Sequence, residues 1–248
     1  VQYMDGIMSK EENPTKTNPA VSLNVTGLGS VEIGTKVDLK YTASLSAGSY
    51  TYGPATGITA QSWSVSCTGV TEGKTTASGT FSQVQATETA KTITAVATYG
   101  DGAMPVTNKG NAYSAAQIKA GSATKTSGNL TGVRHMYWGT MTTDAAITSA
   151  TVRALAKHEA VSNKTLANYT AGASAKKVVV AVPSGKKVSK VLLTTSMNAD
   201  ITSQFVKQPA TVNVEGANGY TAAAYNIFVY QPASIDAAET YAITIANA

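Results

Sequence analysis

Side chains that could do acid–base or nucleophilic chemistry are few in this sequence. Two histidines occur, His135 in an aromatic segment and His158 at the end of a segment with helical spacing. A serine triad would need one of them, a positioned acid and a G-x-S-x-G elbow, and no such elbow occurs. The H-E-x-x-H zinc motif and the phosphate-binding glycine loops are also missing. We therefore expect structural roles for both histidines.

Paired carboxylates, as in glycosidases, are the remaining enzymatic possibility. The acids that could take this role lie mostly in expected turns and are Asp101, Asp200, Glu215 and Asp236. Glu215 stands out because glycines and a tyrosine follow it in VNVEGANGY, but a carboxylate in a turn at a strand end is the commoner reason for this pattern. We therefore expect no enzymatic activity, no catalytic residue, no cofactor and no bound metal.

The single cysteine, Cys67, lies in the alternating segment SWSVSCTG. One cysteine excludes an intramolecular disulfide framework and a cysteine-based zinc site. A reactive thiol would need a nearby base, and neither histidine is close in sequence. We expect Cys67 to be a small buried apolar side chain.

The most promising binding residues are two tyrosines in SYTYGPATGITAQSW, residues 49–63. Tyr50 and Tyr52 alternate with Thr51, so both should lie on one face of a short extended piece. A loop tyrosine pair can stack on a sugar ring or a protein partner. The alternative is a rim that packs over the end of the domain. Tyr50 and Tyr52 are the candidate ligand or partner contacts.

Charge gives little support for a nucleic acid or membrane partner. Charged residues make up 13% of the chain, and the net charge is +5. The only basic doublets, Lys176-Lys177 and Lys186-Lys187, bracket an apolar strand and should solvate its ends. Aromatic and basic residues are not interleaved as single-stranded nucleic acid requires, and no apolar run is long enough for a membrane span.

The first part of the chain predicts an arm followed by a sandwich. Residues 1–19 read as an N-terminal arm or linker, with apolar residues at helical spacing over 1–11 and two Asn-Pro pairs after them. From residue 20 to residue 106 the pattern has period two, typical of an immunoglobulin-like β-sandwich. Trp63 shares its period with Val65 and Cys67 and should point into the core.

The second part predicts a different β-rich domain. Residues 107–121, rich in Gly and Asn, read as a connector, and residues 122–248 as a C-terminal β-rich domain. Five strands are expected there, together with one helix over 143–158 that is capped by Thr143 or Asp144. Residues 220–232 are apolar on both faces, which predicts a central strand. The fold class is therefore mainly β, with an immunoglobulin-like sandwich followed by a β-rich domain containing one helix.

Four segments carry a resemblance that extends over the chain from Asn13 onward. They are SYTYGPATGITAQSW, VATYGDGAMPVTN, SMNADIT and VNVEGANGYTAAAYNIFVYQP. Together they resemble a family of virion structural proteins of tailed phages of gut bacteria, which includes fibre and appendage proteins. The resemblance implies a homotrimer on the head or tail, assembled in the host cytoplasm. Its expected partners are copies of itself, other virion proteins and a host surface glycan.

One alternative from another class stays open. A secreted carbohydrate-binding module or a bacterial adhesin would use the same aromatic loops. A signal peptide would separate these from a virion component. The sequence starts at Val1 and not at Met, so we expect the protein to begin upstream of it.

Overall fold

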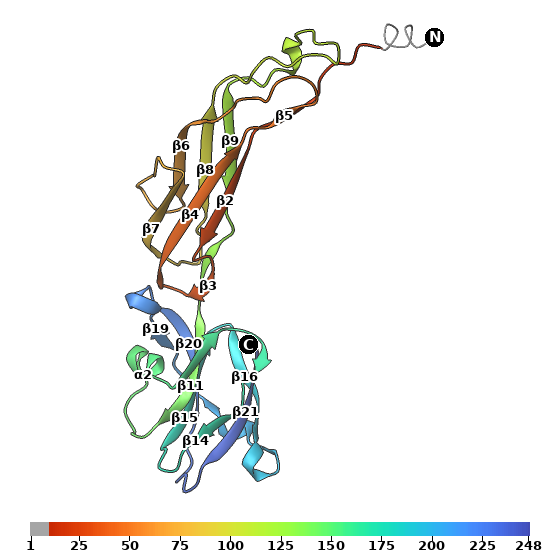
Figure 1. The fold of residues 1–248 in the computed structure, drawn as a ribbon. Helices are drawn as coiled ribbons and strands as arrows, with labels where there is room; N and C mark the ends of the chain where they lie inside the picture. Colours follow the sequence, from red (N-terminus) through yellow and green to blue (C-terminus); the bar gives the residue numbers. More distant parts are fainter. Residues whose placement is uncertain (1–9) are drawn as a thin grey trace. The chain divides into compact units, whose positions relative to one another are not determined.

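The computed structural model describes residues 10–248, which fold as a mainly β protein (Figure 1). The apolar residues at helical spacing near the start of the chain, Val1, Met4, Ile7 and Met8, lie outside this range. Two compact units are present. The first comprises the described residues up to Gly29, with Val37–Val84 and Ala90–Leu130. The second comprises Ser30–Lys36, Gln85–Thr89 and Thr131–Ala248.

Two three-stranded antiparallel sheets build the first unit. One has the order β2 (Ala20–Thr26), β4 (Lys36–Ser46), β7 (Ser78–Gln85), and the other β6 (Ala60–Cys67), β8 (Ile93–Tyr99), β9 (Gly121–Thr126). A short pair joins β1 (Lys16–Thr17) to β5 (Ser49–Tyr50). Buried and exposed residues alternate along β4 and β6, as period-two patterning predicts. This arrangement is compatible with an immunoglobulin-like sandwich.

Hydroxyl side chains face each other across neighbouring strands on the exposed faces of both units. Ser22 and Ser44 are 2.6 Å apart, and Ser62 and Thr98 are also 2.6 Å apart. The other pairs are Thr94–Thr126, Thr68–Thr92, Thr165–Thr244 and Thr170–Thr240. Such uncharged cross-strand pairs stabilise a sheet. They explain how a Thr-rich chain with few charged residues can have polar side chains on the exposed faces of its strands.

The observed division differs from the predicted boundaries. Residues 107–121, expected as a connector, pack within the first unit, where Ile118 is buried and accepts a backbone hydrogen bond from Gly102. Strand β9 then pairs with β8 and completes a sheet of that unit. Its sequence, GSATKT, has no large apolar residue, so no pattern marked it as a strand.

A five-stranded path forms the larger sheet of the second unit, in the order β12, β11, β15, β20, β18, with β19 also paired to β20. The bounds are β11 (His135–Met141), β12 (Lys157–Ala160), β15 (Lys177–Pro183), β18 (Val206–Lys207), β19 (Val212–Val214) and β20 (Ala223–Tyr230). Strand β20 lies inside this sheet, and its last six residues are buried. The expectation of a central strand within 220–232 is confirmed.

The smaller sheet of this unit has the order β13, β21, β16, β17, with β14 also paired to β21. The bounds are β13 (Lys164–Thr165), β14 (Tyr169–Ala171), β16 (Lys186–Leu193), β17 (Ala199–Asp200) and β21 (Glu239–Asn247). Elsewhere, β3 (Gly29–Glu32) pairs with β10 (Leu130–Val133). Short 3-10 helices occur at Ser114–Ala116, Thr194–Ser196, Thr202–Gln204 and Ala217–Gly219.

Apolar side chains cover both faces of the larger sheet in the second unit. Val178, Val180 and Val182 of β15 pack in one cluster with Ile243 and Ile245 of the smaller sheet. The alternate residues of β15 pack on the opposite face with residues of β20 and of the helix α2. Burial on both faces explains why β15 reads as a continuous apolar run.

The helix predicted over residues 143–158 is much shorter in the structure. Helix α2 covers Ser149–Arg153, and Thr148 caps it in a reciprocal capping box with Thr151. The cap is therefore Thr148 and not Thr143 or Asp144. Residues 157–160 instead form β12, because pairing with β11 satisfies their backbone groups. No helix among residues 10–248 is long and apolar enough to span a membrane.

Candidate functional site

The predicted contact residues Tyr50 and Tyr52 both make hydrogen bonds within the first unit. The backbone N–H of Ile118 donates to Tyr50 Oη at 3.0 Å. Tyr52 Oη donates to the Glu12 carboxylate at 2.6 Å. Both rings are half-buried. These hydroxyls are therefore engaged by partners within the chain, and Tyr50 helps to hold residues 107–121 in the unit.

Trp63 and Cys67 lie on the same face of β6, as the period predicted. Trp63 is half-buried, because it lies nearer the start of the strand, while Val65 and Cys67 are buried. Burial raises the pKa of the Cys67 thiol, and the charge of Lys91 opposes this shift only in part. The thiolate is the reactive form of cysteine. Low exposure and a raised pKa therefore both reduce the reactivity of the Cys67 thiol.

We expect Cys67 to react with the thiol reagent DTNB at least about 100-fold more slowly in the native protein than in concentrated urea. The signal has a single source, because the sequence holds one cysteine. A Ser64→Cys, Cys67→Ser variant is the matched control, since Ser64 is exposed on the same strand and its cysteine should react fast in the native state. Equal native rates for the two proteins would contradict the buried position.

The four candidate catalytic acids lie at the surface, and the three aspartates accept hydrogen bonds from nearby residues. Asp101 accepts a backbone hydrogen bond from Ala120 at 2.6 Å, and Asp200 accepts hydrogen bonds from the Thr202 hydroxyl at 2.6 Å and from the Thr202 backbone N–H at 3.0 Å. These hydrogen bonds lower the pKa of both carboxyls. Asp236 accepts from Ser234, and the exposed Glu215 follows β19. Each contact is one that a turn carboxylate commonly makes.

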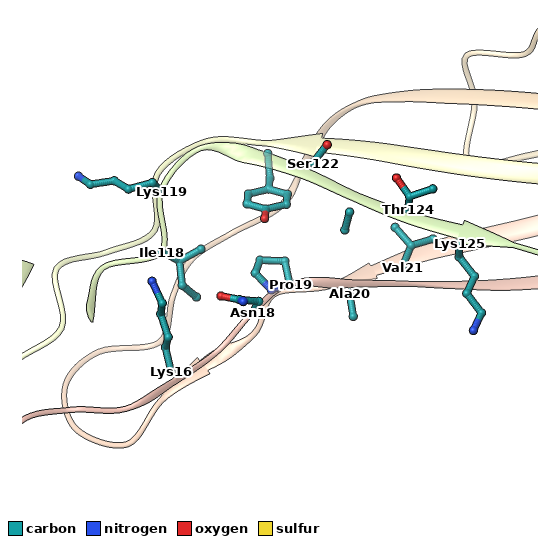
Figure 2. A pocket seen from close by; sticks show the side chains of 12 residues that line it. Lys16, Asn18, Pro19, Ala20, Val21, Ile118, Lys119, Ser122, Thr124 and Lys125 are labelled. Atoms are coloured by element: carbon teal, nitrogen blue, oxygen red, sulfur yellow. The ribbon is translucent and has the colours of Figure 1, made fainter. Parts of the chain in front are cut away.

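A basic groove lies along the first unit, between the edge strands β2 and β9 (Figure 2). It has a volume of about 640 Å³ and is lined by residues of 16–21 and 118–125, together with Tyr99. Figure 2 shows Lys16 and Lys119 at one end and Lys125 at the other. None of its lining residues is acidic. The groove is thus an open, polar surface that favours an anionic partner.

The lysines of this groove differ in how they are engaged. Lys119 Nζ lies 3.3 Å from Asp101 Oδ2 and 2.6 Å from Gln117 Oε1, so its charge is partly paired. Lys16 Nζ donates to the backbone carbonyl of Gln117 at 3.3 Å. Lys125 is exposed on β9. Lys16 and Lys125 are therefore the cations best able to meet a negatively charged ligand.

A second group of polar side chains gathers in the second unit, around Glu32. Arg153 Nη1 donates to Glu32 Oε1 at 2.5 Å, to Tyr137 Oη at 2.9 Å and to the backbone carbonyl of Glu215 at 2.8 Å. Tyr137 Oη in turn donates to Glu32 Oε1 at 2.7 Å. The guanidinium, carboxylate and phenol thus form one connected network.

Burial and these contacts set the charge states of the network. Burial raises the pKa of the Glu32 carboxyl, but the hydrogen bonds from Arg153 and Tyr137 and the Arg153 charge lower it by more. For Tyr137, burial and the hydrogen bond to Glu32 both raise the pKa of the phenol. Glu32 is therefore an anion and Tyr137 a neutral donor at neutral pH.

The two histidines meet beside this network. The structure places His158 on β12 and not at a helix end, and its Nδ1 lies 2.9 Å from Nδ1 of His135 on β11. The ring centroids are 5.1 Å apart. Burial lowers the pKa of His135, and the charge of Glu32 opposes this shift. The neutral imidazole has a free nitrogen lone pair, and it is the form of the side chain that binds a proton or a metal ion.

The sequence did not indicate that Glu32, His135 and His158 come together. Potential ligand atoms of all three lie within 4.8 Å of one another. The two histidines are 23 positions apart, a spacing that suits no short metal motif, and Glu32 is about a hundred residues earlier. Recognising β12 as a partner of β11 is the step that would have placed both imidazoles on one face.

Comparisons with protein-family models, with curated proteins and with solved structures find no match for this chain.

Proposed function

We propose that the chain is a structural component of a bacteriophage virion, a surface fibre or appendage of the head or tail that contributes to host attachment. The observation that carries the proposal is the resemblance of its four quoted segments to virion structural proteins of tailed phages of gut bacteria. Two of these segments, 49–63 and 96–108, lie in the first β unit, and the other two, 196–202 and 212–232, lie in the second.

The architecture supports this proposal in two respects. The chain folds into two β units that contain no disulfide. A surface component of a virion that folds in a reducing cytoplasm before assembly would have to be stable in this way. Hydroxyl pairs that cover the exposed strand faces leave few charges to repel neighbouring copies. We propose a homotrimer that also contacts other virion proteins, has no enzymatic activity, and carries the groove of the first unit toward the host surface.

The groove suits a surface polysaccharide that bears carboxylates, such as a uronic acid polymer. Lys16 and Lys125 would supply the charges, and Asn18, Ser122 and Thr124 supply polar side chains between them. Attraction at an open surface is weak for one site, but repeated copies on a particle multiply it. The same geometry would also suit a carbohydrate-binding module, the alternative function.

A charge reversal of the groove should weaken binding to polygalacturonate. We expect Lys16→Glu with Lys125→Glu to reduce the affinity at least about tenfold at low salt, with the wild-type affinity itself falling as salt is added. The measurement is binding to the immobilised polymer. Lys40→Glu with Lys109→Glu is the matched control, because it changes the net charge equally at exposed lysines outside the groove. Equal losses in both variants would refute a role for the groove.

Purified particles test the proposed function directly. Phage particles from the source culture should band at one density with this chain present, as detected by mass spectrometry of its tryptic peptides. The chain should stay with the particles through a high-salt wash, because assembly contacts bury more surface than chance adsorption. Recovery of the chain only in the soluble fraction or with cell envelopes would favour the secreted adhesin.

A further inference from the structure

Strand pairing in the second unit fixes the position of two imidazoles. His135 of β11 pairs with Ala160 of β12, and Tyr137 pairs with His158. His135 and His158 are therefore diagonal neighbours on one face of the sheet, a spacing that long side chains can bridge. Their Nδ1 atoms lie 2.9 Å apart, so at most one proton is shared between the facing nitrogens.

The Glu32 carboxylate completes a set of three ligands. It arrives from the segment 30–36, which belongs to the same unit as both histidines. One potential ligand atom from each residue lies within 4.8 Å of the other two. Ligands of a tetrahedral zinc ion at its usual bond lengths are about 3.3 Å apart, so small side-chain rotations would bring the three atoms to these positions.

We propose that Glu32, His135 and His158 form a binding site for a divalent transition metal ion, with Zn²⁺ the best fit. Two imidazoles and one carboxylate are a ligand set that zinc commonly takes, and Ca²⁺ or Mg²⁺ would require oxygen ligands instead. His158 is exposed, so the ion can enter from solvent and a water molecule can occupy the fourth position. This inference goes beyond the proposed function and does not depend on it.

Neighbouring residues orient the ligands. Arg153 and Tyr137 hold one carboxylate oxygen of Glu32 by hydrogen bonds. The backbone carbonyl of His135 accepts a hydrogen bond from Tyr225 Oη at 2.6 Å. Such outer contacts fix ligand geometry, while the Arg153 cation offsets part of the attraction for a divalent ion. A bound ion would link the segment 30–36 to β11 and β12, and so stabilise the second unit.

Zinc titration of the full chain tests this site. The protein is prepared without a histidine tag, because its own two histidines are then the only imidazoles present. We expect isothermal titration calorimetry to show one Zn²⁺ bound per chain and differential scanning calorimetry to show a higher Tm with zinc than with EDTA. Saturation of wild-type protein should be reached below about 100 μM Zn²⁺.

Substitutions separate the site from adventitious binding. His158→Ala should weaken binding at least about tenfold and still fold, since His158 is exposed. His135→Ala should do the same, whereas Glu88→Gln, at an exposed acid of the same unit, should bind as the wild type does. No saturable binding by the wild type, or equal affinity in His158→Ala, would overturn the proposal.

Discussion

Replacing Gly34 by alanine is expected to destabilise the second unit by at least about 3–5 kcal/mol, the largest effect that we expect from a single substitution. The Gly34 φ angle is +88°, and an added Cβ would lie inside the van der Waals distance of the Ala217 carbonyl oxygen and 2.5 Å from Tyr220 Cβ. Backbone hydrogen bonds leave little room to relax, because Gly34 N–H donates to Ala86 and Ala217 N–H donates to Ile33.

Gly219→Ala is the matched control for this effect. Gly219 also has a positive φ, of +69°, but an added Cβ there would meet no atom within 4 Å. The control should therefore lose only the left-handed backbone cost of about 1–2 kcal/mol. The difference between the two variants isolates the steric clash around the segment 30–36.

Urea unfolding followed by Trp138 fluorescence measures this difference. The chain has two tryptophans, Trp63 in the first unit and Trp138 in the second, so a Trp63→Phe background reports on the second unit alone. A separate signal is needed because two units need not unfold as one two-state transition. Stabilities of Gly34→Ala and Gly219→Ala within about 0.5 kcal/mol of each other would contradict the close backbone approach.

Removal of the Arg153 guanidinium should have the second largest effect. Arg153→Met leaves the Glu32 carboxylate without its cation in a site where the two side chains are only 27% and 15% exposed. Breaking such a pair from one side leaves a poorly solvated charge, and we expect a loss of about 2–4 kcal/mol. Unfolding is measured by Trp138 fluorescence as above, in EDTA so that no bound metal contributes.

A more exposed ion pair of the same unit supplies the comparison. Lys164 and Glu159 are 2.6 Å apart, with side chains 42% and 35% exposed. Lys164→Met should cost less than about 1 kcal/mol, because solvent screens this pair. The double variant Glu32→Gln, Arg153→Met should lose less than the sum of its single variants, since both remove one network. Additive losses would show that Glu32 and Arg153 act independently.

Sequence reasoning succeeded where a strand had a strong pattern. The mainly β class is confirmed. The sequences of β15 and β20 are nearly continuous apolar runs, the pattern expected of strands that are buried on both faces of a sheet. It failed at β9, whose residues are small or polar, and at β12 (Lys157–Ala160), whose first two residues were assigned to the helix predicted over 143–158. In both cases pairing with a neighbouring strand determines the structure, and this long-range pairing cannot be inferred from the local propensity of the residues.

The candidate sites were less predictable for a related reason. His135, His158 and Glu32 come together through the register of β11 with β12 and through the path of the segment 30–36, neither of which leaves a local pattern. The lysines of the groove likewise come from two ends of the first unit's sequence. Tyr50 and Tyr52 were singled out by their alternation with Thr51 in the segment 49–63, but the sequence does not reveal that Ile118 and Glu12 engage their hydroxyls.

Immunogold electron microscopy of released particles tests the central claim, a place on the virion, most directly. Antiserum raised against residues 120–248 is applied to particles from the source culture, with preimmune serum as the control. The proposal predicts gold at one recurring position on the phage head or tail, which would also locate the chain. Gold on cells alone, with unlabelled particles, would contradict a virion component and favour an adhesin.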